Sequence, residues 1–268
     1  HVYIVGGAVR NFLMGIPPKD IDVVIDSVSL GRGRNSEWFV GQVARSIPVA
    51  TSIATNQYGV AILTVSGMWL LDGEDMQGEV IEVANARKES YSGVGGKGKG
   101  YKPDDVQPAT IEEDVIRREF TVNTLMWRLL DLTDGPERAE VLDLTGLGRQ
   151  HLEERILQTP MDPDRTFADD PTRILRLGKF LLKYGLKPTP DVEAAARRNA
   201  HRLADMPWEA VANILVKDIL DTPKARAGLL WMASLGIVDV LAQMIRTTKP
   251  MATFMAGQMT ADKDVQLL

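Results

Sequence analysis

The sequence predicts an α+β protein in which a small mixed sheet with flanking helices is followed by a wholly helical region. Two observations support this fold class. Short apolar runs bounded by turn residues indicate strands in the first part of the chain, at residues 2–5, 19–25, 47–65 and 78–86. From Asp162 onward, the apolar residues recur instead at the spacing of amphipathic helices.

Length and composition are those of an ordinary soluble protein. The 268 residues suffice for one large domain or two modest ones with ample core-forming material. The chain has no Cys, which excludes a disulfide framework and cysteine-based zinc sites and fits a reducing compartment. No apolar run reaches the length of a membrane span, and no signal peptide precedes the first strand. We therefore expect a cytoplasmic protein with no membrane partner.

The net charge of −5 argues mildly against a nucleic-acid-binding protein, because such proteins are often basic overall. Net charge is, however, a poor measure of a local patch. Basic residues gather in short stretches at residues 32–34, 97–102, 173–183 and 197–202. RNA therefore remains a candidate substrate.

The first candidate site follows the first strand. Gly6 and Gly7 separate this strand from a predicted helix, and glycine there lets backbone N–H groups and the helix N-terminus approach an anion closely. Arg10 stands one turn into the helix, where its guanidinium can reach a phosphate. A Gly-Gly pair by itself is more often plain turn chemistry.

A pair of acids begins the second predicted strand. Asp20 and Asp22 are two residues apart, so a strand would project both carboxylates from one face, and the apolar residues 23–25 would anchor that strand in the core. Two such carboxylates can bind one or two Mg²⁺ ions, because hard cations prefer oxygen ligands. An isolated Asp-x-Asp is more often a turn or a solvated strand end. Beside the glycine pair and Arg10, it indicates nucleotidyl transfer.

These residues form one ordered pattern: Gly-Gly-Ala-Val-Arg at residues 6–10, Leu-x-Gly at 13–15 and Asp-x-Asp at 20–22. The pattern resembles the first motif of the polymerase-β-like nucleotidyltransferases, and more narrowly that of the class II tRNA nucleotidyltransferase and bacterial poly(A) polymerase family. The resemblance extends over residues 2–245 in ordered motifs and implies a polymerase-β-like nucleotidyltransferase head followed by an all-α neck and body. Asn11 departs from it, because the family usually has Asp there. The amide can keep the hydrogen bonds but not the charge.

A helix and a strand pair are predicted next. We expect the helix to begin near Ser36, with Ser36 as its N-cap and Glu37 in its first turn. Residues 47–65 indicate strands around a turn at residues 56–59.

Glu82 stands among the apolar residues of the strand predicted at residues 78–86, where an unpaired charge is costly to bury. One interpretation is an edge-strand acid that faces water. The family resemblance implies the other, a third catalytic carboxylate beside Asp20 and Asp22.

Residues 88–108 are rich in Gly, Ser, Lys and Tyr and show no periodicity, so we expect a long loop without regular structure. Its segment Gly-Gly-Lys-Gly-Lys-Gly, residues 95–100, does not match the P-loop pattern, which excludes an ATPase of that class. Such a segment would suit a flexible basic flap over RNA or nucleotide, and the resemblance also implies a mobile loop here.

A helix is predicted over residues 110–125, with Thr110 as N-cap and Glu113 completing a capping box. Within it, residues 117–123 resemble the family motif Arg-Arg-Asp-Phe-Thr-Ile-Asn, which handles the sugar and phosphates of the nucleotide. Adjacent arginines on a helix usually form a solvated face, but the length of the resemblance favours a nucleotide site. The resemblance implies nucleotide binding by Arg118, Glu119 and Asn123, with Glu119 replacing the family's Asp.

A turn at residues 142–148 marks the expected end of the first domain, and it resembles the acid- and glycine-containing joint of the family. His151, just after it, is expected in a surface or structural role rather than in catalysis. We expect three parts: a catalytic head at residues 1–145, a helical neck and body for nucleotide selection and RNA binding at 146–250, and a C-terminal tail at 251–268.

A helix predicted at residues 167–180 carries the second candidate site. Asp170 and Arg173 are three residues apart, so they would project side by side from one helix face. Their acceptor and donor groups could pair with the edge of cytosine or adenine, although an ordinary salt bridge is the commoner alternative. The segment resembles the family's Glu-Asp-x-x-Arg nucleotide-selecting helix, with Asp as its first acid here. The resemblance adds Arg176 and Lys179 as nucleotide-binding residues, with Lys179 in place of an Arg.

Together, the motifs and the resemblance imply a Mg²⁺-dependent transferase that adds CCA to tRNA 3′ ends from CTP and ATP without a nucleic-acid template. Asp20, Asp22 and Glu82 would be its catalytic acids, and Asp20 and Asp22 would bind two Mg²⁺ ions. A poly(A) polymerase, or an enzyme that adds only C or only A, is the alternative within the enzyme class. A non-catalytic RNA-binding relative is the alternative outside it. The expected partners are tRNA or another RNA 3′ end, CTP and ATP, with no protein partner.

Overall fold

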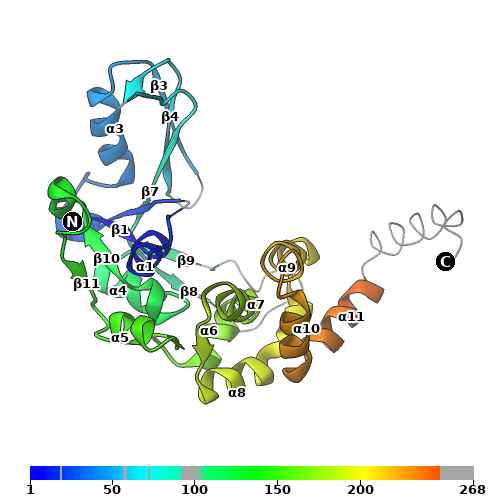
Figure 1. Cartoon of the computed structure of the whole chain (residues 1–268). Coiled ribbons are helices and arrows are strands. Elements are labelled where there is room, and N and C mark those ends of the chain that lie inside the picture. Colours follow the sequence, from blue (N-terminus) through cyan, green and yellow to red (C-terminus); the bar gives the residue numbers. More distant parts are fainter. Residues whose placement is uncertain (19, 57–58, 72, 92–102, 104, 248–268) are drawn as a thin grey trace, which may run out of the picture. The chain divides into compact units, whose positions relative to one another are not determined.

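The structure, a computed structural model, describes residues 1–18, 20–56, 59–71, 73–91, 103 and 105–247 (Figure 1). The chain divides into two units. Unit 1 comprises His1–Ser90, Asp104–Glu154 and Gln158–Met161, and unit 2 comprises Tyr91–Pro103, Arg155–Leu157 and Asp162–Leu268.

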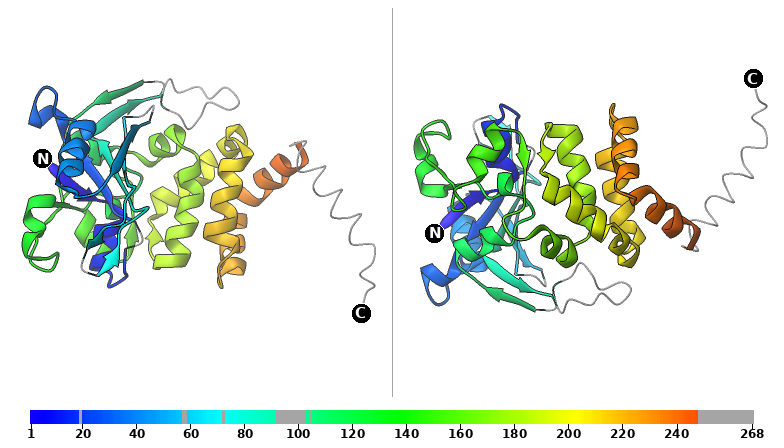
Figure 2. Two further views of the ribbon diagram at one scale, coloured as in Figure 1. Left: turned by 90° about the horizontal axis from the view of Figure 1, so that it is seen from above. Right: turned by 90° about the horizontal axis from the view of Figure 1, so that it is seen from below.

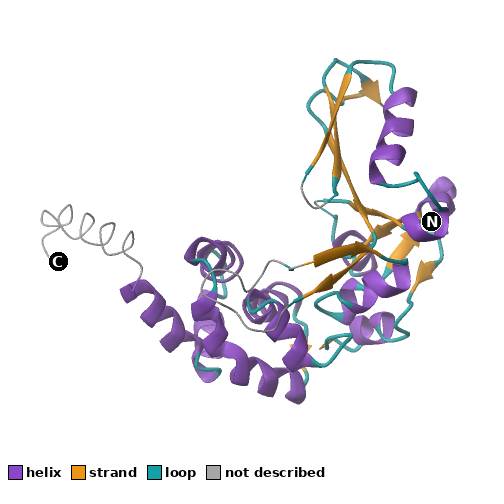
Figure 3. Cartoon of the chain, turned by 180° about the vertical axis from the view of Figure 1, so that it is seen from behind, coloured by secondary structure: helices purple, strands orange, loops and turns teal. Residues whose placement is uncertain are grey.

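Unit 1 is built on a seven-stranded sheet with the strand order β11–β10–β1–β2–β7–β4–β3 (Figure 3). In this sheet β2 and β7 run parallel and the other neighbouring pairs run antiparallel, so the predicted mixed sheet is confirmed. Its strands are β1 (Val2–Val5), β2 (Asp22–Ile25), β3 (Thr51–Thr55), β4 (Ala61–Val65), β7 (Val80–Asn85), β10 (Met126–Arg128) and β11 (Val141–Leu142).

Short helices and two hairpins complete unit 1. The helices are α1 (Gly7–Leu13), α2 (Ser27–Leu30), α3 (Ser36–Ser46), α4 (Ile111–Ile116) and α5 (Gly148–Glu153), with 3₁₀ helices η1 (Thr121–Asn123) and η2 (Leu129–Asp134). The hairpins pair β5 (Leu70–Leu71) with β6 (Glu74–Asp75), and β8 (Arg87–Ser90) with β9 (Asp105–Pro108).

Successive residues of the central strand β2 enter different hydrophobic clusters, because neighbouring side chains of a strand point to opposite faces. Val24 belongs to the cluster of Ile111 and Val115 from α4. Ile25 belongs to the cluster of Val40 from α3. The sheet is therefore covered by α4 on one face and by α3 on the other.

The start of α3 differs from the prediction by one residue. Asn35, not Ser36, is the N-cap, and its side chain accepts a hydrogen bond from the Trp38 N–H at 3.0 Å. Ser36 is buried, and its hydroxyl donates to the backbone oxygen of Gly59 at 2.8 Å. The hydroxyl therefore fixes the connection between β3 and β4 instead of capping the helix.

The capping box predicted at Thr110 and Glu113 is present at the start of α4. The helix is shorter than predicted, since it ends at Ile116 and is followed by the separate 3₁₀ helix η1. Between them Phe120 adopts an extended conformation and is fully buried. Burial of this large apolar side chain turns the backbone out of the helical path, which local helix propensity does not predict.

The loop predicted at residues 88–108 is partly wrong. Arg87–Ser90 and Asp105–Pro108 pair as an antiparallel hairpin with Glu89 opposite Val106. The glycine-rich segment 95–100 lies outside the described residues.

The described part of unit 2 is helical, as the sequence predicts, apart from one short parallel strand pair, β12 (Ile156–Leu157) with β13 (Lys187–Pro188). Figure 2 shows these helices in green to orange. They are α6 (Pro163–Asp169), α7 (Thr172–Lys179), α8 (Pro190–Asn199), α9 (Trp208–Leu215), α10 (Ala225–Ser234) and α11 (Ile237–Thr247), with the π-helical turns η3 (Phe180–Tyr184) and η5 (Val216–Leu220) and the 3₁₀ helix η4 (Ala200–Asp205).

The helix predicted at residues 167–180 is broken into α6 and α7. Asp170 has φ −143° and ψ 96°, and Pro171 follows it. A proline lacks the N–H of a helical hydrogen bond and disfavours the helical conformation of the residue before it, so the break falls here.

Among the described residues, no single helix is long and apolar enough to cross a membrane. The consecutive helices α10 and α11 together reach that length and apolarity, but they are bent by 97° to one another.

The close contact between α5 and η1 predicts that a larger side chain is poorly tolerated between them. Thr121 Oγ1 and His151 Nδ1 lie 2.8 Å apart across it. A Cβ added at Gly148 would lie 2.7 Å from the backbone oxygen of Thr121 and 2.9 Å from Leu125 Cδ2. Because a backbone atom must move, Gly148→Ala should lower the free energy of unfolding by about 1–3 kcal/mol, measured by urea denaturation.

Gly41→Ala in α3 is the matched control, because nothing lies within 4 Å of a Cβ added there. Alanine has the higher helix propensity, so this variant should be neutral or more stable by up to about 1 kcal/mol. Equal stabilities of the two variants would contradict the packing argument.

Candidate functional site

A cavity of about 240 Å³ opens at the start of β2 and β7 in unit 1. Val23 pairs with Val83 in these parallel strands, so Asp22 and Glu82 stand one residue earlier on adjacent strands and on the same face. Both acids line the cavity, together with Arg117 and Arg118. Asp114 and Arg87 also line it, so carboxylates and guanidinium groups meet in one cavity.

The two acids of the Asp-x-Asp motif have different positions. Asp22 is the first residue of β2 and pairs with Val5 of β1. Asp20 lies exposed in the segment before the strand and is not among the residues that line the cavity. The strand predicted from residue 19 begins only at Asp22, so alternation within a strand does not place Asp20 and Asp22 on one face. The register of the paired strands places Asp22 beside Glu82 instead.

Gly6 makes the turn after β1 with φ +70°, a conformation that favours glycine. A Cβ there would lie 3.3 Å from Arg118 Nη1 and 4.0 Å from Asp22 Oδ2. The bare backbone of Gly6 therefore lies directly beside a guanidinium and a carboxylate of the site. Gly7 begins α1, and a Cβ on it would lie 3.6 Å from Arg10 Nη2.

Arg10 is buried, with 5% of its surface exposed. Its Nε and Nη2 donate to Asn11 Oδ1 at 3.1 and 2.7 Å, and its Nη1 donates to Asn123 Oδ1. Asn123 in turn donates from Nδ2 to Glu119 Oε1 at 3.0 Å. Three predicted nucleotide-binding residues, Arg10, Glu119 and Asn123, are thus joined in one hydrogen-bonded chain. This chain also includes Asn11, the residue that departs from the family pattern.

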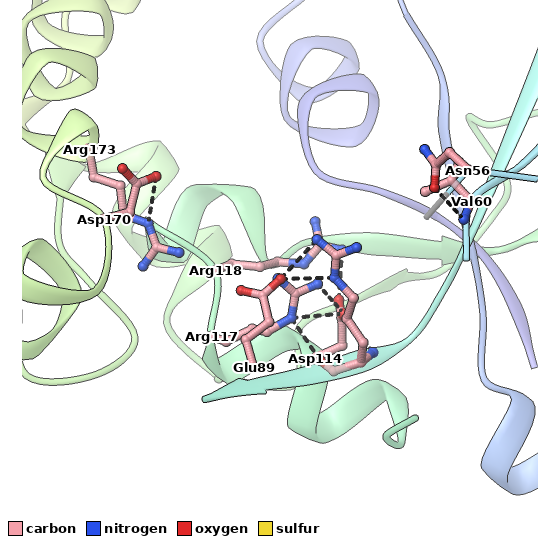
Figure 4. A network of polar contacts seen from close by, with 9 residues as sticks. Asn56, Val60, Glu89, Asp114, Arg117, Arg118, Asp170 and Arg173 are labelled. Carbon is pink, nitrogen blue, oxygen red and sulfur yellow. Dashed lines mark hydrogen bonds and ion pairs between the residues drawn. The ribbon is translucent and has the colours of Figure 1, made fainter. Parts of the chain in front are cut away.

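Arg118 and Arg117 are both held by Asp114 of α4 (Figure 4). Asp114 is fully buried, and burial by itself raises the pKa of its carboxyl. The charges of Arg118 and Arg117 and the hydrogen bonds from Arg117 and the Arg87 N–H outweigh this effect and lower the pKa below its ordinary value of 3.8. The carboxylate is therefore ionised at neutral pH.

The second candidate site lies at the start of α7 in unit 2. Asp170 Oδ1 accepts hydrogen bonds from the Thr172 N–H at 3.0 Å and the Thr172 hydroxyl at 2.6 Å. Since Pro171 already has helical φ and ψ angles of −59° and −23° and Asp170 does not, Asp170 caps the first turn of α7. Its Oδ2 lies 3.8 Å from Arg173 Nε, an ion pair longer than a hydrogen bond (Figure 4). Arg173 is largely buried, and its Nη1 lies 3.4 Å from the backbone oxygen of Thr166.

The other two predicted residues of unit 2 lie further along α7. Lys179 forms an ion pair with Asp218 of η5, with Nζ 3.1 Å from Oδ2. Arg176 lies one turn before Lys179 and is partly buried. This ion pair favours a structural role for the Lys179 side chain, in addition to any contact with a nucleotide.

Sequence reasoning missed two polar residues beside the cavity. Asp114 stands three and four residues before Arg117 and Arg118, a spacing that predicts ion pairs on a helix and was the available signal. Asn85, which lines the cavity, accepts from the Ser36 N–H at 2.8 Å and donates to the Gly59 oxygen at 3.1 Å. No sequence pattern indicates that contact, since its partners are far apart along the chain.

The donor set of the cavity fits a magnesium ion shared with a substrate. Within the described part of the chain, no three His, Cys, Asp or Glu side chains are grouped so as to hold a metal. Mg²⁺ is commonly bound by one or two carboxylates and completed by phosphate oxygens and water, rather than by a cage of protein ligands. The carboxylates of Asp22 and Glu82 at one cavity wall meet that requirement.

Comparison with known proteins gives a match to a family model over residues 2–158, described as the Poly A polymerase head domain. The chain is 29% identical to tRNA nucleotidyltransferase cca2 of Schizosaccharomyces pombe, a match that covers 73% of this chain and 38% of that protein. It is 31% identical to the multifunctional CCA protein of Haemophilus ducreyi, over 69% of this chain and 35% of that protein. It is 28% identical to poly(A) polymerase I of Salmonella typhi, over 77% of this chain and 39% of that protein.

Solved structures of CCA-adding enzymes are also similar to this chain. A CCA-adding enzyme in its apo form II is similar with a TM-score of 0.69 and 26% identity, over 89% of this chain and 49% of that one. The Thermotoga maritima CCA-adding enzyme complexed with tRNA has the same fold, with a TM-score of 0.66 and 24% identity. The match covers 89% of this chain and 47% of that one. The chain thus spans less than two-fifths of the curated relatives above and less than half of either structure.

The buried Asp114 predicts a specific acid sensitivity. A carboxyl whose pKa is lower in the folded than in the unfolded state stabilises the fold above the unfolded pKa, and this stabilisation is lost as the pH falls through the folded pKa. From about pH 4 downward, the free energy of unfolding should fall more steeply for the wild type than for Asp114→Asn, by at most about 1.4 kcal/mol per pH unit. Urea unfolding at a series of pH values measures both slopes, and parallel curves would refute the assignment.

Proposed function

Because residues 2–158 match its model, the chain belongs to the poly(A) polymerase head domain family, and on that premise we propose that it adds CCA to tRNA 3′ ends. The reaction is the template-independent transfer of nucleotides from CTP and ATP to an RNA 3′-OH. The observation that carries the proposal is the cavity in which Asp22 and Glu82 share a wall with Arg118. The resemblance to CCA-adding proteins supports this reaction within the family.

Asp20 and Asp22 hold Mg²⁺ in this proposal, with Glu82 beside Asp22 on the adjacent strand. When bound, Mg²⁺ lowers the pKa of the 3′-OH and neutralises charge on the triphosphate as pyrophosphate leaves. Asp22 and Glu82 are positioned by strand pairing rather than by flexible loops. Such rigid placement is what a site for in-line transfer requires.

The nucleotide's phosphates bind between the glycine turn and the arginines. Gly7 offers its backbone N–H at the start of α1, and Arg118 lies beside the bare face of Gly6, whose own N–H donates to the backbone oxygen of Leu125 at 3.1 Å. Arg10 is held by Asn123, which is itself held by Glu119. These three residues keep one guanidinium in a fixed orientation near the turn, and a fixed guanidinium loses less entropy when it binds a phosphate.

Asp170 and Arg173 select the base. A carboxylate oxygen accepts from the exocyclic amino group that cytosine and adenine share, and the guanidinium donates to the ring nitrogen and to the carbonyl oxygen of cytosine. Arg176 and Lys179 add positive charge in the last turn of the same helix. Because one oxygen of Asp170 already caps α7, the other is the one left for a base.

Two alternatives remain to be separated from this proposal. The similarity to poly(A) polymerase I, at 28% identity, is close to the similarity to the CCA proteins. An enzyme that adds only A, or only C, would use the same residues. A non-catalytic RNA-binding relative would keep the fold without the transfer.

One incubation distinguishes these outcomes. The protein is mixed with Mg²⁺, a tRNA that lacks its 3′ CCA, and each labelled NTP, singly and together. Two C additions followed by one A support CCA addition, a long run of A supports the polymerase alternative, and no incorporation supports the RNA-binding relative.

Substitution of the acids tests the catalytic assignment. Asp22→Ala and Asp20→Ala should each reduce incorporation about a thousandfold or more, because metal-mediated charge stabilisation contributes several kcal/mol to the barrier. Glu74→Ala, at an exposed acid of the β5–β6 hairpin, is the matched control and should act like the wild type. Near-normal turnover of either aspartate variant would overturn the role of that residue.

Two substitutions at Asp170 separate base selection from helix capping. Asp170→Ala removes the cap, at a cost of about 1 kcal/mol in stability, and also the acceptor for the base. Asp170→Asn keeps a cap acceptor but turns the other oxygen into a donor. Both variants should lose the preference for C and A over U and G by about 1–3 kcal/mol, while only the alanine variant loses stability.

Incorporation of all four NTPs and thermal unfolding are measured for both variants. If Asp170 were only a helix cap in an ordinary salt bridge, Asp170→Asn would keep the wild-type NTP profile. That result would assign base selection to other residues.

A further inference from the structure

Asp114 holds the two arginines of the cavity wall although it belongs to none of the motifs that predicted the site. It is fully buried in α4, and both of its carboxylate oxygens accept hydrogen bonds (Figure 4). A buried carboxylate is costly unless its charge is paired and its oxygens are hydrogen-bonded. Here both conditions are met by the same two arginines.

The two oxygens of Asp114 have separate partners. Oδ1 accepts from Arg117 Nη2 at 2.6 Å, from Arg117 Nε at 3.2 Å and from the Arg87 backbone N–H at 3.1 Å. Among the described residues, Oδ2 accepts only from Arg118, whose Nη2 lies 2.9 Å away. Oδ1 therefore ties α4 to β8, whereas Oδ2 fixes the side chain that lines the cavity.

Arg118 depends on this contact. Its second hydrogen bond, from Nη1 to the backbone oxygen of Asn123, is 3.5 Å long and therefore weak. In the part of the chain that the structure describes, its buried Nε has no hydrogen-bond partner. Arginine has many rotamers, so without Oδ2 the guanidinium would be poorly fixed beside Gly6.

We propose that Asp114 is a positioning residue for nucleotide binding, because its Oδ2 fixes the Arg118 guanidinium at the cavity wall to receive a phosphate of a nucleoside triphosphate. This inference rests on the proposed function, since it assumes that the cavity binds a nucleoside triphosphate. A phosphate is the chemistry that the wall fits, because a guanidinium donates to phosphate oxygens in a fixed fork.

Asp114→Asn distinguishes the roles of the two carboxylate oxygens. The amide oxygen takes the place of Oδ1, where three donors converge, because an NH₂ group there would face only other donors. The NH₂ group must then occupy the place of Oδ2 and face Arg118 Nη2. This variant is nearly isosteric and keeps acceptors for Arg117 and Arg87, but it replaces the acceptor for Arg118 by a donor.

Glu89→Gln is the matched control. Glu89 is an acid of the same network and pairs with Arg117 at 3.1 Å and with Arg87 at 2.8 Å. It has no hydrogen bond or ion pair with Arg118, whose two hydrogen bonds go to Asp114 and Asn123. Its substitution weakens the same ion network without touching the proposed phosphate-binding side chain.

The experiment measures the affinity of the full chain for CTP and for ATP with Mg²⁺ by calorimetry, together with thermal unfolding and the KM values for nucleotide and tRNA. Asp114→Asn should weaken nucleotide binding by about 10- to 100-fold, as expected for loss of a hydrogen bond between charged groups, and raise the nucleotide KM while leaving the tRNA KM unchanged. Glu89→Gln should lose stability but bind nucleotide like the wild type.

A double-mutant cycle shows whether Asp114 acts through Arg118. In an Arg118→Ala background, Asp114→Asn should cause no further loss of nucleotide affinity, because the group that it positions is gone. Losses that add in the double variant, or an Asp114→Asn variant that binds as tightly as the wild type, would overturn the inference. A wild-type protein that binds neither nucleotide would overturn the proposed function and this inference with it.

If Asp114→Asn does not fold, Asp114→Glu replaces it in the same measurements. Glutamate keeps the charge that pairs with Arg117, but one additional methylene group displaces the oxygen that holds Arg118. It should also weaken nucleotide binding about tenfold, and unchanged affinity would again overturn the inference.

Discussion

The site of unit 1 depends on the pairing of β2 with a neighbour on each side. The antiparallel pairing with β1 sets Asp22 opposite Val5, immediately before the Gly6 turn. The parallel pairing with β7 sets Glu82 beside Asp22 on the same face. Since strand side chains alternate, a shift of one residue in either register would turn one carboxylate away from the cavity. The apolar residues Val24 and Ile25, which enter different clusters, prevent such a shift.

Charge is concentrated around this wall, and its burial is possible only because the groups compensate one another. Asp114 is fully buried, while Arg117 and Arg118 retain 25% and 18% exposure of their side chains. Removal of one member of such a cluster leaves the others uncompensated in a poorly solvated place. The carboxylate that fixes the cavity arginine Arg118 is therefore also the one that ties α4 to β8, each through a different oxygen.

Local patterns predicted much of the fold, whereas contacts between distant residues did not follow from them. Short apolar runs located β1, β2, β3, β4 and β7 but not β10 and β11, which are only three and two residues long. The spacing of Thr110 and Glu113 located the start of α4. The buried Phe120 that ends the predicted helix early, and the pairing of Arg87–Ser90 with Asp105–Pro108, depend on tertiary packing. In the site, motif order indicated the arginines and acids, but not that Asn85 of β7 accepts a hydrogen bond from the Ser36 N–H of α3.

The departure at Asn11 illustrates how a neutral residue can serve a charged site. Asn11 Oδ1 accepts two hydrogen bonds from Arg10, so it fixes the guanidinium as an aspartate could. An amide carries no charge, however, so Asn11 orients Arg10 without adding a negative charge beside it. Asn123 holds Arg10 in the same way and links it to the carboxylate of Glu119. Two neutral amides, Asn11 and Asn123, thus help to fix the guanidinium close to Gly7.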